Sequence, residues 1–399
     1  MNKRKITTLI CSLALAFTLF STNKAYGWDG KADGTGTHAL IVTQAVEMIK
    51  NDTIDNAPPS VQKNFEILQS YLKKLQHGST YPDYDPTAYK LYQDHFWDPD
   101  TDHNFTQDNK WYLSYAINQT GESQLRKLFA LAKDEWKKGN YENSVWLLGK
   151  GLHYFGDFTT PYHPANVTAV DSTGHVKFET YVEERKDKYK INTIGNEVNK
   201  DFYSDTLKNT NLDNWITDFS KFWAKKSKKE YYTHASMSHS WKEWDIGATN
   251  AMHNSQIGSA GIIYRFLNEV SGTIQNTEDS NVKEIMLVIK TSNEDKAGTD
   301  HTIYFGLETN QGKKYEWTLD NPGNDFEKNQ EDTYRILLKN SKIDLKDISK
   351  TWIRKEKYGK IRDDWKPEYV KVIINSSVKY ESNINKWFGN NKTFYINNK

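Results

Sequence analysis

The hydrophobic positions of this chain follow one spacing in its first two thirds and a different one in the remainder. From about residue 37 to residue 270, apolar residues recur every three to four positions, which places them on one face of an α-helix. Two stretches show this spacing clearly: Leu40, Ile41, Ala45, Met48 and Ile49, and then Val145, Leu147, Leu148, Leu152 and Phe155. The spacing predicts a domain of many helices, and the span is longer than a simple bundle needs.

The pattern changes at residues 271–281, SGTIQNTEDSN, a polar segment without periodicity that is typical of a linker. Beyond it come short runs rich in β-branched and aromatic residues, separated by Gly, Asn and Asp turns: EIMLVIK, TIYFGLET, YEWTL, TYRILL, YVKVIIN and TFYIN. Six or more short strands in one region predict a β-sandwich. We therefore expect an all-α domain over residues 28–273 and an all-β domain over residues 274–399.

Residues 1–27 have the composition of a secretory signal peptide. Three basic residues precede an apolar stretch from Ile6 to Phe20, and small residues at positions 25 and 27 predict cleavage before Trp28. The alternative is a membrane anchor, but the apolar stretch is shorter than the roughly 20 residues that span a bilayer. We expect a secreted, extracellular protein that begins at Trp28.

Cleavage changes the chemistry that the chain has available. It removes the single cysteine, Cys11, so a metal site must use imidazole, carboxylate and backbone groups. It also removes four of the 53 Lys and Arg and none of the 52 Asp and Glu, which leaves a net charge of −3. A weakly acidic chain lacks the electrostatic footprint of a nucleic-acid-binding protein, so no nucleic-acid partner is expected.

Histidine is concentrated in the helical region, where ten of the eleven histidines lie. Four stretches combine histidine with carboxylates: WDGKADGTGTH, YPDYDPTAYKLYQDHFWD, HYFGDFTTPYH and GHVKFE. In HYFGD and HVKFE an imidazole and a carboxylate stand four residues apart, on one face of a helix. One such pair is often an ordinary solvated ion pair. Two pairs close together in sequence, with another histidine between them, favour a zinc site.

An ordered series of motifs is similar to the zinc-dependent phospholipase C family of Gram-positive bacteria, of the clostridial alpha-toxin type. The motifs are WDGKADGTGTH, GSTYPDYD, YQDHFWDPDTD, HYFGD, TPYHPANVTAVDSTGHVKFET, THASMSHSW and DNPGNDF, and together they extend over the mature chain. The resemblance implies a multi-helix catalytic domain of the zinc phospholipase C and P1 nuclease type. It also implies a following C2-like (PLAT) β-sandwich that binds membranes.

The resemblance further implies three zinc ions with ligands at matched positions. One zinc would be bound by the amino and carbonyl groups of Trp28 with His38 and Asp157, a second by His95, His153 and the same Asp157, and a third by His163, His175 and Glu179. Asp83 would lie beside them, as a ligand or as the general base. Tyr84 and Phe96 match the family's choline-side aromatic residues, although rings beside ligands can also simply pack in a core.

Elementary chemistry agrees with this implied site. An α-amino group has a pKa of about 7.7–8.0, so zinc can displace its proton near neutral pH and cleavage before Trp28 would complete the site. The alternative for Trp28 is a frayed terminus. Clustered zinc ions suit phosphoester cleavage, because they lower the pKa of water and stabilise charge on the attacking and leaving oxygens. Aromatic rings recognise the quaternary ammonium of choline.

For the β-domain the resemblance implies calcium and a membrane-inserting loop. The calcium ligands at matched positions are Gly298, Thr299, Asp300, Asn324, Asp325 and Asp363. Lys296 and His301 stand where the alpha-toxin type carries acids, and Asp295 could compensate, so at least one calcium site is expected to be weakened or absent. In KYGKIRDDW, Tyr358 and Ile361 are expected to enter the membrane interface; the alternative is a surface hairpin with no partner.

These expectations combine into one function. We expect a secreted, monomeric phospholipase C that uses zinc and calcium and acts at phospholipid membranes on phosphatidylcholine, with sphingomyelin as a further candidate substrate. The products would be diacylglycerol and phosphocholine, and the protein would be a haemolytic toxin. Two alternatives stay open at this point: a zinc nuclease of the P1/S1 type, and a non-catalytic lipid-binding or pore-forming toxin with structural zinc.

Overall fold

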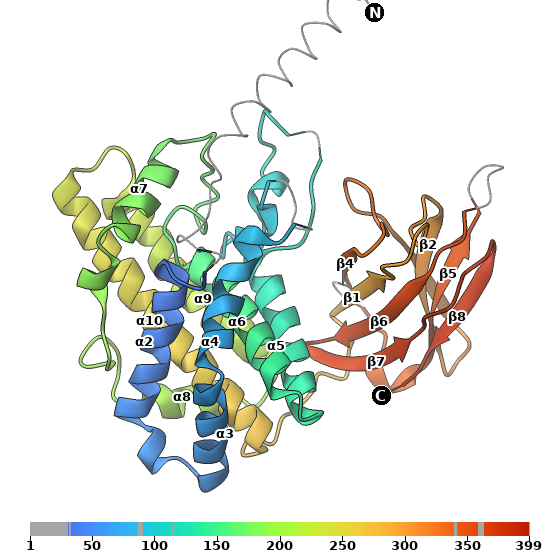
Figure 1. Cartoon of the computed structure of the whole chain (residues 1–399), viewed down its shortest axis with the longest axis horizontal. Coiled ribbons are helices and arrows are strands. Elements are labelled where there is room, and N and C mark those ends of the chain that lie inside the picture. The colour runs from blue at the N-terminus through green and yellow to red at the C-terminus, as the bar shows by residue number, and fades with distance from the viewer. Residues whose placement is uncertain are drawn as a thin grey trace, which may run out of the picture.

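A computed structural model of the chain describes residues 31, 33–86, 91–113, 115–338, 341–357 and 363–398. A helical domain and a β-domain lie side by side, with α5 next to the β-domain (Figure 1). The predicted order, an all-α domain followed by an all-β sandwich, is confirmed. Trp28, predicted as a zinc ligand, and Tyr358 and Ile361, predicted to enter the membrane, lie outside the described residues.

The helical domain arises from the segments with helical periodicity. Its α-helices are α2 (Thr37–Asp52), α3 (Pro59–Ser70), α4 (Leu72–Thr80), α5 (Gly121–Lys137), α6 (Tyr141–Phe158), α7 (Gly174–Glu183), α8 (Phe202–Lys208), α9 (Leu212–Glu230) and α10 (Trp241–Ser271). Short 3₁₀ helices are η1 (Ile54–Asn56), η2 (Tyr81–Tyr84), η3 (Gln93–His95), η4 (Phe105–Gln107) and η5 (Lys186–Tyr189), and η6 (Tyr231–Ala235) is a π-helical turn. A capping box of Ser240 and Glu243 starts α10, and Gly272, with a left-handed φ of 69°, ends it.

A glycine lets α4 and α6 approach closely. A Cβ atom on Gly78 would lie 2.3 Å from the backbone oxygen of Trp146, so any larger residue there would push the two helices apart. The close packing places the carbonyl oxygen of Ser79 only 2.8 Å from Nδ1 of His153 on α6. Helix packing in α4 and α6 therefore orients one of the predicted metal ligands.

The β-domain consists of two antiparallel four-stranded sheets. Their orders are β4-β1-β6-β7 and β3-β2-β5-β8. The strands are β1 (Glu284–Thr291), β2 (Thr302–Thr309), β3 (Lys314–Leu319), β4 (Glu331–Leu337), β5 (Ile348–Glu356), β6 (Pro367–Ile374), β7 (Ser377–Asn383) and β8 (Lys392–Ile396), with the 3₁₀ turn η7 (Leu345–Asp347) before β5. The domain boundary predicted at 273/274 falls between α10 and β1.

Strand β1 is buried on both of its faces, because it also forms the boundary with the helical domain. Ile285, Leu287 and Ile289 point into the sandwich core. Met286 and Val288, on the opposite face, pack against Ala130 and Leu131 of α5 in a small apolar cluster. This contact fixes one sheet of the β-domain on the helical domain.

A buried ion cluster lies next to this apolar contact. Glu284, at the start of β1, has its Oε2 atom 2.9 Å from Nη2 of Arg126 on α5 and 2.7 Å from Nε of Arg335 on β4. Arg335 also donates to the backbone oxygen of Asn118 at 2.6 Å. One carboxylate therefore links arginines from both domains, and burial makes the loss of either partner costly.

Within the part of the chain that the structure describes, every helix is too short or too polar to cross a lipid bilayer.

Candidate metal centre

The described candidates for the zinc centre all meet inside the helical domain. They come from the helices α2, α6 and α7, the turns η2 and η3, and the turn after α6. Each is at most 5% exposed: His38, Asp83, His95, His153, Asp157, His163, His175 and Glu179. Buried imidazoles and carboxylates are costly unless they are paired or bind a cation. Their ligand atoms fall into three groups, and within each group these atoms lie within 4.8 Å of one another.

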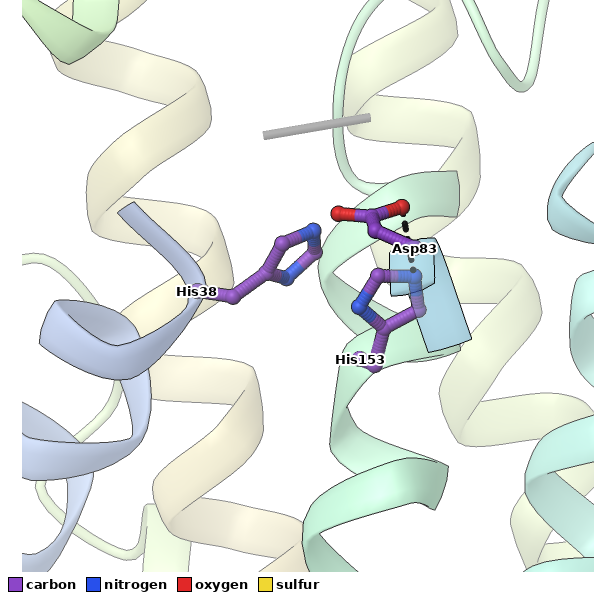
Figure 2. A group of neighbouring side chains, drawn as sticks. All are labelled: His38, Asp83 and His153. Carbon is purple, nitrogen blue, oxygen red and sulfur yellow. Dashed lines mark ion pairs between the residues drawn. The ribbon is translucent and has the colours of Figure 1, made fainter. Parts of the chain in front are cut away.

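The first group joins the start of α2, the turn η2 and the helix α6 through His38, Asp83 and His153. Figure 2 shows the three side chains converging from these elements, with the carboxylate of Asp83 beside the ring of His153. The Oδ1 atom of Asp83 lies 3.5 Å from Nε2 of His153, and the rings of His38 and His153 stack at 4.0 Å. Asp83 therefore lies within this group rather than beside it.

The second group contains His95, His153 and Asp157. Oδ2 of Asp157 is 2.7 Å from Nδ1 of His95 and 3.1 Å from Nε2 of His153. The other oxygen of Asp157, Oδ1, lies 3.4 Å from Nε2 of His38. One carboxylate thus faces ligands of the first group with one oxygen and of the second with the other, which is the geometry a bridging ligand needs.

The third group contains His163, His175 and Glu179. The Nε2 atoms of the two histidines are 3.2 Å apart. Oε1 of Glu179 lies 2.8 Å from Nε2 of His175 and 3.4 Å from Nε2 of His163. His175 and Glu179 stand four residues apart on α7, as the sequence pattern predicted. Two imidazole nitrogens and a carboxylate oxygen face one point, a donor set that suits zinc.

Backbone carbonyls fix the orientation of several rings. Nδ1 of His153 donates to Ser79 O at 2.8 Å, and Nδ1 of His175 donates to Val167 O at 2.7 Å. A histidine that donates one ring N–H in this way turns its other nitrogen, as an acceptor, toward the group. Sequence reasoning missed these two carbonyl partners, because backbone atoms carry no residue signature.

Several buried polar atoms of the centre make no hydrogen bond to any described residue, although other ligands lie close to them. They include Nε2 of His38, Oδ1 of Asp157 and Oε1 of Glu179. A buried polar group without a hydrogen bond destabilises the fold unless something else satisfies it. A metal cation at each group would satisfy these atoms, so the residues present fit zinc.

The pKa shifts of two histidines agree with side chains ready to bind a metal, whereas for His95 the charge of Asp157 outweighs burial and raises the pKa to about 9. Burial, together with the neighbouring His153, lowers the pKa of His38 to about 3, and burial lowers the pKa of His175 to about 4. Both imidazoles are therefore neutral at pH 7, the state that binds metal. Burial raises the pKa of Glu179 to about 8, because it disfavours the charged carboxylate and the contact with His163 offsets only part of this cost. A bound cation would remove that cost.

The two predicted choline-side residues occupy different environments. Tyr84 is half-buried and follows Asp83 in η2. Phe96 is buried, and its ring stacks on that of His163 with a centroid distance of 4.2 Å and an interplanar angle of 11°. Phe96 thus backs the third group. Contact of either ring with choline stays a prediction.

The six predicted calcium residues lie on neighbouring loops of the β-domain. Asp363 accepts hydrogen bonds at Oδ2 from the Thr299 hydroxyl at 2.8 Å and from the Asp300 backbone at 2.7 Å. A Cβ atom on Gly298 would approach the loop between β3 and β4, which carries Asn324 and Asp325.

Two other carboxylates, Asp295 and Asp332, bear on the predicted calcium site. Asp295 forms an ion pair with Lys328 at 2.6 Å, so the residue that could compensate for Lys296 already has a partner. Sequence reasoning missed Asp332, a buried carboxylate beside Asp325. Burial raises the pKa of Asp325 to about 6 and that of Asp332 to about 7. The sequence signal that could have pointed to Asp332 was its position near the start of β4, after several polar residues.

Comparison with known proteins gives consistent matches over both domains. Residues 37–230 match a family model described as zinc dependent phospholipase C, and residues 285–397 match one described as a PLAT/LH2 domain. A phospholipase C of Clostridium haemolyticum is 74% identical over 399 residues, with 100% of both chains covered. A phospholipase C of Clostridium perfringens (strain 13 / Type A) is 54% identical over 396 residues, covering 99% of this chain and 100% of that relative.

A solved structure is similar as well. The alpha toxin from Clostridium absonum superposes with a TM-score of 0.89 at 56% sequence identity, covering 92% of this chain and 100% of that chain. The similarity therefore includes both domains in one arrangement.

Proposed function

The chain belongs to the zinc-dependent phospholipase C family, and we propose that its mature form, beginning at Trp28, binds three zinc ions and hydrolyses phosphatidylcholine at membranes. The products are diacylglycerol and phosphocholine. Sphingomyelin carries the same phosphocholine group and is the second substrate to test. We also propose that the protein is exported, acts as a monomer and lyses red blood cells.

The observation that supports this proposal most strongly is the meeting of eight buried imidazole and carboxylate side chains in three adjoining groups. In the proposed assignment Asp157 bridges the His38 and His95 groups, and the terminal amine of Trp28 completes the first. Zinc bound there supplies activation of water and stabilises negative charge on the phosphate oxygens. The carbonyl-bonded rings of His153 and His175 hold their ligand nitrogens in place.

Asp83 is proposed to orient the attacking water and to receive its proton. Its carboxylate is fully buried and lies 3.5 Å from Nε2 of His153, so a water among these groups is within hydrogen-bond reach. The half-buried ring of Tyr84 extends from the same turn, where it can contact the quaternary ammonium of a choline headgroup.

The β-domain is proposed to bring this centre to a lipid surface. The match of residues 285–397 to the PLAT/LH2 domain supports membrane binding, and the segment that contains Tyr358 and Ile361 is the proposed insertion site. The buried Glu284 cluster and the apolar contact with α5 hold the two domains in one arrangement. Docking of the β-domain therefore also orients the helical domain.

The decisive experiment measures phosphocholine release from vesicles of phosphatidylcholine and of sphingomyelin, and cleavage of single-stranded DNA, by the zinc-loaded mature protein. We expect phosphocholine release, its loss after chelation and its return with zinc. Cleavage of DNA without phosphocholine release would contradict the proposal in favour of a P1/S1-type nuclease. Amino-terminal sequencing of the active protein should begin at Trp28.

Replacing Asp83 with Asn is expected to lower hydrolysis of a soluble choline phosphodiester about 100-fold, because general acid–base groups contribute on that scale. Zinc content, measured by elemental analysis, should stay at three per chain if Asp83 is the base, and should fall if Asp83 is a ligand.

Asp85→Asn is the matched control, since Asp85 lies two residues away, pairs with Lys150 at 3.8 Å and belongs to none of the three groups. Undiminished hydrolysis by Asp83→Asn would rule out both roles. Cell lysis that persists in a variant without hydrolysis would favour the lipid-binding alternative.

Calcium binding to the loop of Asn324 and Asp325 is expected to depend on pH. Because burial raises the pKa of Asp325 to about 6 and that of Asp332 to about 7, calcium must displace protons from them in weakly acidic solution. Affinity should rise roughly 10- to 100-fold from about pH 5.5 to about pH 7.5.

Calorimetry of the zinc-loaded protein, in buffers with different enthalpies of ionisation, measures both the affinity and the released protons. Asp325→Asn and Asp332→Asn should each weaken calcium binding and reduce proton release. Calcium affinity that does not change with pH would contradict this assignment.

A further inference from the structure

The carboxylate of Glu183 contacts the residues on either side of a short turn, Lys31 before it and Thr37, the first residue of α2, after it. Its Oε2 atom accepts a hydrogen bond from the Thr37 hydroxyl at 2.7 Å, and its Oε1 atom lies 3.1 Å from Nζ of Lys31. Lys186 pairs with the same Oε1 atom from within the segment that follows α7. Thr37 is fully buried and the Glu183 side chain is only 12% exposed, so their hydrogen bond is shielded from water, whereas the Lys31 side chain is 47% exposed.

The turn between Lys31 and Thr37 is held by its own hydrogen bonds. The backbone N–H of Gly34 donates to Lys31 O at 2.9 Å, and Oδ1 of Asp33 accepts from the Thr35 backbone at 3.0 Å. Gly34 has a φ of 76°, and a Cβ atom there would lie 2.5 Å from the ring of His77, so the turn also rests closely on α4. Two hydrogen bonds therefore hold the described part of the turn, and Glu183 contacts a residue on each side of it.

Glu183 also lies on the helix face that carries two proposed zinc ligands. His175, Glu179 and Glu183 follow one another at intervals of four residues on α7, so they share one side of the helix. Thr37 immediately precedes His38, the ligand at the start of α2. Through the contact between Glu183 and Thr37, the helix of the third group holds the segment that leads into the first group.

We propose that Glu183 is a positioning residue that clamps residues 31–37 and thereby holds the amino terminus of the cleaved chain at the metal group of His38. This inference rests on the proposed function, in which the amine of Trp28 is a zinc ligand. Trp28 precedes Lys31 by three residues in the sequence, and three residues span at most about 11 Å. Chain termini are otherwise poorly ordered, and a clamp this close limits the positions that the amine can occupy.

The test compares variants of the mature, zinc-loaded protein that weaken the clamp in steps. Glu183→Ala removes the hydrogen bond and the ion pair. Glu183→Gln keeps an acceptor for Thr37 but loses the charge opposite Lys31. Lys31→Met removes only the partner on the turn. Lys186→Ala is the matched control, because Lys186 contacts Glu183 without touching the turn.

Two measurements report on the clamp without relying on activity. The first is the rate at which a chelator removes each zinc ion. The second is labelling of the α-amino group of residue 28 by an amine-reactive reagent, followed by peptide mapping. In Glu183→Ala we expect one of the three zinc ions to leave about 10- to 100-fold faster, as for other groups that support metal ligands, and the amine to label faster. Glu183→Gln and Lys31→Met should show smaller increases, and Lys186→Ala should behave like wild type.

Thermal unfolding in excess zinc separates positioning from general stability, because saturating metal should return the Glu183→Ala midpoint close to that of wild type. Wild-type zinc release and amine labelling in Glu183→Ala would overturn the inference while leaving the proposed function intact. Equal effects of Lys186→Ala and Glu183→Ala would also overturn it, since they would indicate a general loss of helix α7. A wild-type mature protein that binds no zinc would overturn the proposed function itself.

Discussion

Asp157→Asn is expected to lower kcat/KM for phosphocholine release by about a thousandfold or more, because the proposed bridge between two metal groups would be lost. Oδ1 of Asp157 lies 3.4 Å from His38. Oδ2 lies 2.7 Å from His95 and 3.1 Å from His153. A neutral amide binds zinc poorly and cannot span both positions with charged oxygens. A thousandfold loss corresponds to about 4 kcal/mol of transition-state stabilisation.

Elemental analysis provides the second measurement for this variant. Zinc should fall from three ions to one per chain, because the third group uses His163, His175 and Glu179 and none of its ligands changes. Asp187→Asn, an exposed carboxylate on the same domain, serves as the control and should keep full activity and zinc content. Full activity and three zinc ions in Asp157→Asn would refute the bridging assignment.

Glu284→Gln is expected to lower the free energy of unfolding by about 3 kcal/mol, because removal of one charge from a buried ion cluster weakens the compensation of the arginines that remain. Oε2 of Glu284 faces Arg126 at 2.9 Å and Arg335 at 2.7 Å, one from each domain. Urea unfolding of the zinc-loaded protein measures the effect. Glu381→Gln is the matched control, because its pair with Lys138 also joins the domains but is partly exposed and should contribute less than about 1 kcal/mol.

The same cluster gives a pH dependence with a definite sign. Burial alone would raise the pKa of Glu284, but Arg126 and Arg335 outweigh it and lower the pKa to about 2 from its usual 4.5. A carboxylate with a lowered pKa stabilises the fold fully above its unfolded value, and this stabilisation is lost as the pH falls from about 4.5 to about 2. The stability difference between wild type and Glu284→Gln should therefore shrink over this range. A difference that stays constant with pH would contradict the role given to the charge.

Much of the fold was predictable because burial leaves a periodic trace in the sequence. The helical spacing from Leu40 to Ile49 and from Val145 to Phe155 predicted α2 and α6, and the six β-type runs predicted β1, β2, β3, β4, β6 and β8. Strand β5 was not predicted, because Lys355 points inward and is fully buried, which disguises the alternation of apolar and polar residues. Trp352 of the same strand is also buried, on the opposite face of β5, where it covers Gly306.

Local sequence also predicted candidate ligands wherever their spacing lies within one helix. His153 and Asp157 on α6, and His175 and Glu179 on α7, are four residues apart and share a face in the structure. No local spacing relates Asp83 to His38 and His153, because the turn η2 after α4 places Asp83 beside these two histidines. Its place among the candidates came from motif resemblance and agrees with the geometry.

By itself, the sequence determined the order of the two domains, the helix faces and the residue types that can bind zinc, because periodicity and donor chemistry are local properties. The tertiary structure alone decided that Asp157 faces two groups at once, that Ser79 and Val167 orient ligand rings, and that Glu183 fastens the segment before His38. These contacts depend on how separate helices pack. Packing distances follow from side-chain volumes across the whole domain, as at Gly78, and no stretch of sequence encodes them alone.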